Sequence, residues 1–219
     1  MRRDSDIKRD VEQELRSTPS IDATDIAVTV KDGVVTLTGF VHSYIDKFEA
    51  EQIAKRVLGV LGVANDLEVR LRGRDERPDP EIARDAVAAI KTRLPLAGKD
   101  IKVVVEDGWV TLEGEVEWHY QREFAESTVR WVKGVKGVTN LIKLRPVPAP
   151  SPDEIRRKIE EAFRRSAEID ANRIAVEAHG GEVILKGTVR SWAERQEAER
   201  VAWATAGVSK VDNWLAVSA

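Results

Sequence analysis

Apolar residues recur at helical and strand spacing in the same order three times along this chain. Each repeat begins with apolar residues four positions apart, a spacing that places them on one face of a helix. Two runs that alternate apolar and polar residues follow, then a second helical stretch and a third strand-like run. The three opening rows, which we expect to lie in the core, are Ile7, Val11 and Leu15; Ile82, Ala86 and Ile90; and Ile155, Ile159 and Phe163.

In the same three repeats, a glycine and an asparagine are separated by a constant number of residues. Gly39, Gly114 and Gly187 each lie 26 residues before an asparagine, and the copies align without gaps at offsets of 75 and then 73 residues. A fixed period of this kind indicates one small unit copied along the chain.

Glycines also mark equivalent turns in each copy. The first two strands meet at Asp32-Gly33, Asp107-Gly108 and Gly180-Gly181, pairs that tolerate the positive φ angles of a tight hairpin. A glycine near the end of the second strand predicts a bulge or a close backbone contact, and a glycine after the second helix is expected to stop it in the left-handed conformation. The repeated motif positions are Gly33, Gly108 and Gly181; Gly39, Gly114 and Gly187; Gly59, Gly134 and Gly207; and Asn65, Asn140 and Asn213.

The start of the second helix carries a capping signal in two copies. Ser191 and Glu194 have the spacing of a capping box, and Ser43 occupies the related position in the first copy. In the second copy Trp118 replaces the serine, so the cap is lost there or supplied by another residue.

These patterns predict an α+β protein of three tandem α-β-β-α-β units. Each unit is expected to be a small three-stranded mixed sheet covered by two helices on one face, with a right-handed crossover and an open second face where neighbours or ligands could pack. The expected domains are residues 1–72, 78–146 and 151–219. The charged first linker is expected to be mobile, and prolines at every second position from Pro146 to Pro152 favour an extended spacer. The sequence leaves open whether the domains form a compact triangle or beads on a string.

Composition narrows the function classes. With 33% charged residues and a net charge of −3, the chain has a mixed-charge surface and no basic excess for nucleic acid. It has no cysteine, and no stretch approaches the ~20 apolar residues of a transmembrane segment. We expect a cytoplasmic protein if Met1 is the native start and a periplasmic one if a signal peptide was removed; the oligomeric state is not predicted.

No motif indicates catalysis, a metal or a cofactor. The chain's three histidines, His42, His119 and His179, lie at non-equivalent positions, so no repeated site can use them. Phosphate loops and nucleophile elbows are absent from the sequence. Asp32 and Asp107 are interpreted as turn residues rather than cation ligands. The chain is therefore expected not to be an enzyme.

Aromatic residues at the start of the second helix are the candidate contacts for a ligand or partner. One interpretation is that they staple the helix start or fill contacts between units; the other is an exposed patch that binds a partner or a membrane interface. The candidates are Tyr44, Trp118, His119, Tyr120 and Trp192.

The repeat resembles the bacterial BON family, named for OsmY and nodulation proteins. The resemblance is carried by Gly187-x-Val189-x-Ser191-x-x-Glu194 and by Gly207-Val208-x-x-Val211-x-Asn213-x-Leu215, and it covers nearly the whole chain in three copies. It implies a transport-associated binding module linked to osmotic stress, the cell envelope and phospholipid interaction.

The function expected from this resemblance is a non-enzymatic, stress-associated binding or scaffold protein, with phospholipid, an envelope component or a protein as its partner. The alternative is a sensor that binds a small ligand or ion between domains.

Overall fold

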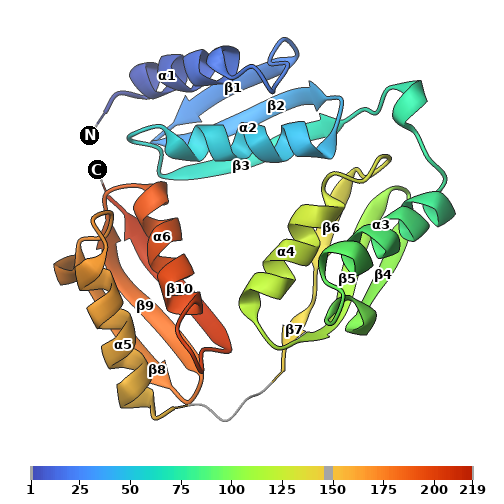
Figure 1. The fold of residues 1–219 in the computed structure, drawn as a ribbon. Helices are drawn as coiled ribbons and strands as arrows, with labels where there is room; N and C mark the ends of the chain where they lie inside the picture. The colour runs from blue at the N-terminus through green and yellow to red at the C-terminus, as the bar shows by residue number, and fades with distance from the viewer. Residues whose placement is uncertain (1, 146–149, 219) are drawn as a thin grey trace.

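The computed structural model describes residues 2–145 and 150–218, which form three similar domains (Figure 1). In each domain the two helices pack on one face of a mixed sheet, whose middle strand is antiparallel to the first and parallel to the last. The predicted α+β class and the α-β-β-α-β order are therefore confirmed. The first domain consists of α1 (Asp4–Ser17), β1 (Ile26–Lys31), β2 (Val34–Val41), α2 (Tyr44–Arg56) and β3 (Gly62–Val69).

The second and third domains repeat this order with one difference. In the second domain the last strand is split into two short pieces, β6 and β7, which both pair with β5. The second domain consists of α3 (Asp79–Arg93), β4 (Ile101–Glu106), β5 (Trp109–Val116), α4 (His119–Val129), β6 (Gly137–Asn140) and β7 (Lys143–Leu144). The third consists of α5 (Pro152–Arg165), β8 (Ile174–His179), β9 (Glu182–Val189), α6 (Trp192–Trp203) and β10 (Lys210–Val217).

Each domain has its own hydrophobic core between the helices and the sheet. All nine residues of the three helical rows are buried, as their spacing predicts. Alternating residues of the strands, such as Val35 and Leu37, face them from the sheet. Small residues on the second helix, Ala50, Ala125 and Ala198, are fully buried and let this helix lie close to the strands.

The glycines on the second strands make the predicted close backbone contact. Gly39, Gly114 and Gly187 have φ angles of 113°, 128° and 128°. A Cβ atom on any of them would overlap the carbonyl oxygen of the residue that precedes the first strand, Asp25, Asp100 or Arg173 respectively. Only glycine fits here, because both the conformation and the space exclude a side chain.

The prediction that the next glycines stop the second helix is wrong in position. The helices end at Arg56, Val129 and Trp203, three to five residues before Gly59, Gly134 and Gly207. Each of these glycines has a φ of 92° and lies in the following turn against the start of the domain's first helix. A Cβ on Gly134 would lie 2.7 Å from Cδ1 of Ile82, so the residue leaves room for that helix rather than capping the other.

The serine caps are confirmed, and the second copy replaces its cap. Ser43 Oγ accepts a hydrogen bond from the Asp46 N–H, and Ser191 Oγ accepts one from the Glu194 N–H. At the start of α4 the side chain of Gln121 accepts hydrogen bonds from the N–H groups of Glu117 and Trp118 instead.

The two linkers differ in how much of them the structure describes. In the first linker a short 3-10 turn spans Gly73–Asp75, and Asp75 forms an ion pair with Lys133 of the second domain at 3.9 Å. Of the proline-rich spacer, Pro146 and Pro148 lie outside the described residues, and Pro152 is the first residue of α5.

The three domains are arranged in a ring with the second helices on its inner side. Figure 1 shows α2, α4 and α6 facing the middle, the first helices on the outside, and the two chain ends close together where the first and third domains meet. This arrangement answers the question that the sequence left open in favour of the compact triangle.

Candidate functional site between the second and third domains

The first residue of each second helix reaches the next domain round the ring. Tyr44 packs against the core of the second domain, and Trp192 packs against the core of the first. His119, at the equivalent position, stacks on Trp203 of the third domain, with ring centroids 3.9 Å apart and planes inclined by 9°. Three equivalent contacts therefore close the ring head to tail.

On the neighbouring domain, each joint also includes a residue from one repeated position of the second helix or the turn after it. At the offsets of 75 and 73 residues, Lys55 of the first domain corresponds to Arg130 of the second and Trp203 of the third. The Arg130 guanidinium lies 3.7 Å from the centroid of the Phe48 ring, and Lys55 Nζ lies 5.4 Å from the centroid of the Trp192 ring.

A further polar contact joins the third domain to the first. The Gln196 side chain donates a hydrogen bond of 3.3 Å to the Gln52 side chain. Both residues lie on the inward-facing helices α6 and α2.

The joint between the second and third domains contains a groove of about 910 Å³ between α4 and α6. Its aromatic lining comes from the start of α4 and the end of α6. Trp118 and Tyr120 are 50% and 63% exposed, so their rings are accessible from solvent. The aromatic residues that line it are Trp118, His119, Tyr120, Phe124 and Trp203.

His119 is uncharged at neutral pH. Burial under Trp203, together with the charge of Arg122, lowers its pKa to about 4. Its Nε2 atom lies 3.6 Å from the Glu123 carboxylate, but this contact is not an ion pair because the ring lacks the second proton that would give it a positive charge. The stacked pair therefore supplies aromatic surface and no positive charge.

Both arginines that line the groove form ion pairs, whereas its glutamates do not pair with a charged arginine or lysine within the described part of the chain. Arg130 pairs with Glu126 and Arg200 pairs with Glu197, each at 2.6 Å, and neither carboxylate lines the groove. Glu199 accepts a hydrogen bond from Asn213. Burial and the nearby Glu126 carboxylate raise the pKa of Glu123, although 55% of its side chain is exposed and water screens the effect.

The structure thus separates the five candidate contact residues predicted from sequence. Tyr44 and Trp192 fill the other two joints, while Trp118, His119 and Tyr120 line the groove. Sequence reasoning did not select Phe124, Glu123 or Trp203 for this site. The repeat alignment could have indicated Trp203, because it stands where the other copies have a basic residue.

The motif asparagines have a structural role in all three domains. Each side-chain amide donates to a backbone carbonyl of the second helix and to a glutamate on that helix, as Asn140 does to Arg122 and Glu126. Its oxygen accepts from the N–H two residues later. These contacts tie the last strand to the second helix.

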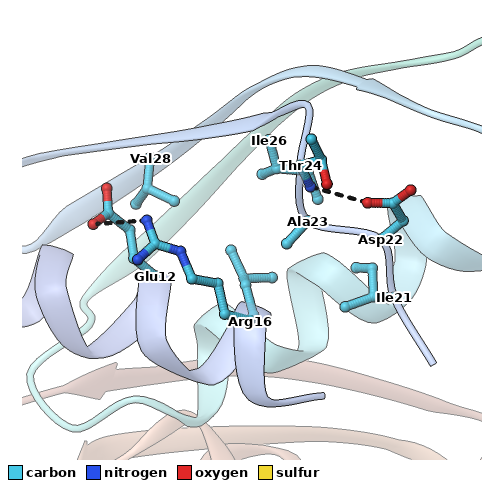
Figure 2. A pocket seen from close by; sticks show the side chains of 9 residues that line it. Glu12, Arg16, Ile21, Asp22, Ala23, Thr24, Ile26 and Val28 are labelled. Atoms are coloured by element: carbon cyan, nitrogen blue, oxygen red, sulfur yellow. Dashed lines mark hydrogen bonds and ion pairs between the residues drawn. The ribbon is translucent and has the colours of Figure 1, made fainter. Parts of the chain in front are cut away.

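A second cavity, of about 440 Å³, lies beside the end of α1 (Figure 2). Its charged groups contact each other or the backbone: Arg16 lies 4.0 Å from Glu12, and Asp22 accepts from the Thr24 N–H.

Within residues 2–145 and 150–218, no three histidine, aspartate or glutamate side chains are grouped so that they could hold a metal ion. No helix among them is long and apolar enough to span a bilayer.

The repeated fold and its motif residues define the class of protein. The sequence profile of the BON domain matches residues 3–70, 78–146 and 151–219, so the chain belongs to the BON domain family.

Among curated proteins, the chain is similar to osmotically-inducible protein Y of Escherichia coli (strain K12). The two are 37% identical over 146 residues, which cover 64% of this chain and 72% of the relative.

Among solved structures, the chain is similar to CdsD, a structural protein of the type III secretion system of Chlamydia trachomatis. Identity is 16%, with 97% of this chain and 92% of that one covered, and the TM-score is 0.28. A match at that score carries no argument about function or domain arrangement.

Proposed function

We propose that the chain is a non-enzymatic, stress-associated binding protein whose second domain attaches to an anionic phospholipid surface. Membership of the BON family and the similarity to an osmotically inducible protein support the stress association. The observation that carries the phospholipid proposal is an apolar surface on the second domain, formed by Leu96, Tyr120 and Phe124.

This apolar surface is unusually accessible. Leu96 is 83% exposed, and together with Tyr120 and Phe124 it lines a shallow depression of about 360 Å³ beside Pro95. Exposed apolar side chains that gather in one place mark an interaction site, and aromatic rings suit the boundary between water and acyl chains.

Basic residues flank the same surface. The Arg93 guanidinium lies 5.7 Å from the centroid of the Phe124 ring, and Lys91 and Lys99 are exposed on the same segment. Each basic residue near an anionic membrane contributes about 1 kcal/mol of attraction. Apolar insertion and charge therefore favour the same orientation on an anionic bilayer.

The test is sedimentation of the full chain with vesicles. We expect binding to phosphatidylglycerol-containing vesicles at low salt, weaker binding to phosphatidylcholine vesicles, and a loss of about fivefold or more in Leu96→Asp, since a carboxylate cannot enter the interface. The matched control is Leu58→Asp, because Leu58 is a leucine 57% exposed on the first domain. Equal sedimentation of both variants, or no binding by the unmodified chain, would contradict the proposal.

A second candidate function, the binding of a small ligand between domains, is favoured by the groove between α4 and α6. Its volume of about 910 Å³ lies within the range of small-molecule sites, and its lining combines aromatic rings with a few charged groups.

A further inference from the structure

We propose that the groove between α4 and α6 binds a small organic cation of the alkylammonium class through its aromatic rings and unpaired carboxylates. This inference rests on the second candidate function and deepens it by naming the ligand chemistry.

The three joints of the ring differ in charge. In two of them a basic residue lies over an aromatic ring of the neighbouring domain, Arg130 over Phe48 and Lys55 near Trp192. At the third joint the equivalent of those basic residues is Trp203, which stacks on the neutral His119. This joint therefore has the aromatic surface without the cation, and it is the joint that encloses the groove.

The charged groups that line the groove are only partly neutralised by other side chains. Arg130 and Arg200 are already paired with carboxylates that do not line the groove. Among the described residues, His119, which is neutral, is the only basic side chain at ion-pair distance from the Glu123 carboxylate, and Arg122 and Arg130 act on it at longer range. The Glu117 carboxylate has no ion-pair partner in the same part of the chain. The groove thus offers negative charge to a ligand, and an anion would meet repulsion there.

The exposed rings determine which cation fits. Trp118 and Tyr120 present exposed rings to the groove, and the face of an aromatic ring attracts a cation within about 6 Å. An alkylammonium group is weakly hydrated and leaves water for such a surface, whereas a metal ion needs several oxygen ligands close together. In the part of the chain that the structure describes, no such ligand cluster is present.

The test uses the indole N–H signals of the full-length protein in NMR spectra, without vesicles. The chain contains six tryptophans, of which Trp118 and Trp203 line the groove while Trp131 and Trp214 are exposed elsewhere. The protein is titrated separately with choline chloride, with sodium chloride at equal ionic strength, and with 3,3-dimethyl-1-butanol, the uncharged analogue of choline. We expect saturable shifts of Trp118 and Trp203 with choline alone, and unchanged Trp131 and Trp214 signals.

Two variants test the role of charge. Glu123→Gln should weaken choline binding by about fivefold or more, because it removes a carboxylate beside the bound cation. Glu113→Gln is the control, since Glu113 is exposed on β5 in the same domain, does not line the groove and changes the net charge equally.

The proposal is wrong if choline acts no differently from sodium chloride, if the uncharged alcohol produces the same shifts, or if Glu123→Gln binds choline as the unmodified chain does. Failure of the vesicle experiment would leave this result untouched, because phosphatidylglycerol carries no ammonium group and the choline titration contains no lipid.

Discussion

Gly114 and its two equivalents occupy positions where both the backbone conformation and the available space exclude a side chain. The first residue of β4 pairs with Gly114 at a point where a side chain would overlap the Asp100 carbonyl, and the φ of 128° is strained for any other residue. We expect Gly114→Ala to lower the free energy of unfolding by about 2–4 kcal/mol, measured by urea unfolding of the full chain.

Gly73→Ala is the matched control for this substitution. No atom lies within 4 Å of a Cβ built on Gly73, and its φ is not positive, so its effect should stay within about 0.5 kcal/mol. A similar effect of the two substitutions would show that the close contact at Gly114 does not constrain the fold.

The sequence predicted this residue-scale feature better than it predicted the sites. A glycine repeated at one strand position indicates a local backbone requirement, and the close contact follows from neighbours in the same hairpin. The role of Gly134 could not be predicted in the same way, because Ile82, which excludes its side chain, is more than fifty residues away and meets it only in the folded domain.

The start of α6 depends on a buried carboxylate. Glu194 is 4% exposed and accepts hydrogen bonds of 2.8 Å from the N–H groups of Arg190 and Asp170. Burial acts to raise its pKa, but these hydrogen bonds and the Arg190 guanidinium outweigh burial, so its pKa lies below the ordinary value of 4.5. The carboxylate thus joins α6 to the segment before β8.

Removing this carboxylate should lower the free energy of unfolding by an amount that depends on pH. Because the folded pKa is lowered, the stabilisation is complete above pH 4.5 and is lost as the pH falls through the lower folded pKa. We expect Glu194→Ala to lower the free energy of unfolding by about 1–3 kcal/mol at neutral pH, where two part-buried N–H donors lose their acceptor, and by less in acid. Urea unfolding at pH 7 and pH 3 measures both values.

Glu168→Ala, at an exposed position in the same domain, is the control for this measurement. An equal cost of Glu194→Ala at the two pH values would mean that the carboxylate's charge does not hold the helix start.

At the scale of elements, the sequence predicted which segments form helices and strands because local periodicity determines their buried faces. It also predicted the Ser191 cap, but it did not predict that Glu194 would reach Asp170, because that contact joins segments that are 24 residues apart in the sequence and meet only in the folded domain. The split of the last strand in the second domain has no signal in the repeat pattern, which is the same there as in the other copies.

At the scale of the whole molecule, the first residue of the second helix has different roles in different domains of the ring. Tyr44 and Trp192 pack against the core of the neighbouring domain, whereas the equivalent His119 stacks on Trp203 at the edge of an open groove. The two interpretations of these aromatics from sequence therefore apply to different copies. Periodicity could not separate them, because it describes each domain alone and the difference lies in the residues that the next domain offers.

The ring itself is the central claim, and the contact between the first and third domains, which no linker joins directly, closes it. The most direct measurement is the distance between spin labels at Gln52→Cys and Gln196→Cys, a pair that is easily labelled because the chain has no native cysteine. Labels at Gln13→Cys and Gln52→Cys, both in the first domain, report whether the labelled protein is folded. The ring predicts a short, single-peaked distance between positions 52 and 196 that broadens in Trp192→Ala, because the two side chains touch across the joint that Trp192 fills. A long and broad distribution in the unmodified chain, unchanged by Trp192→Ala, would contradict it.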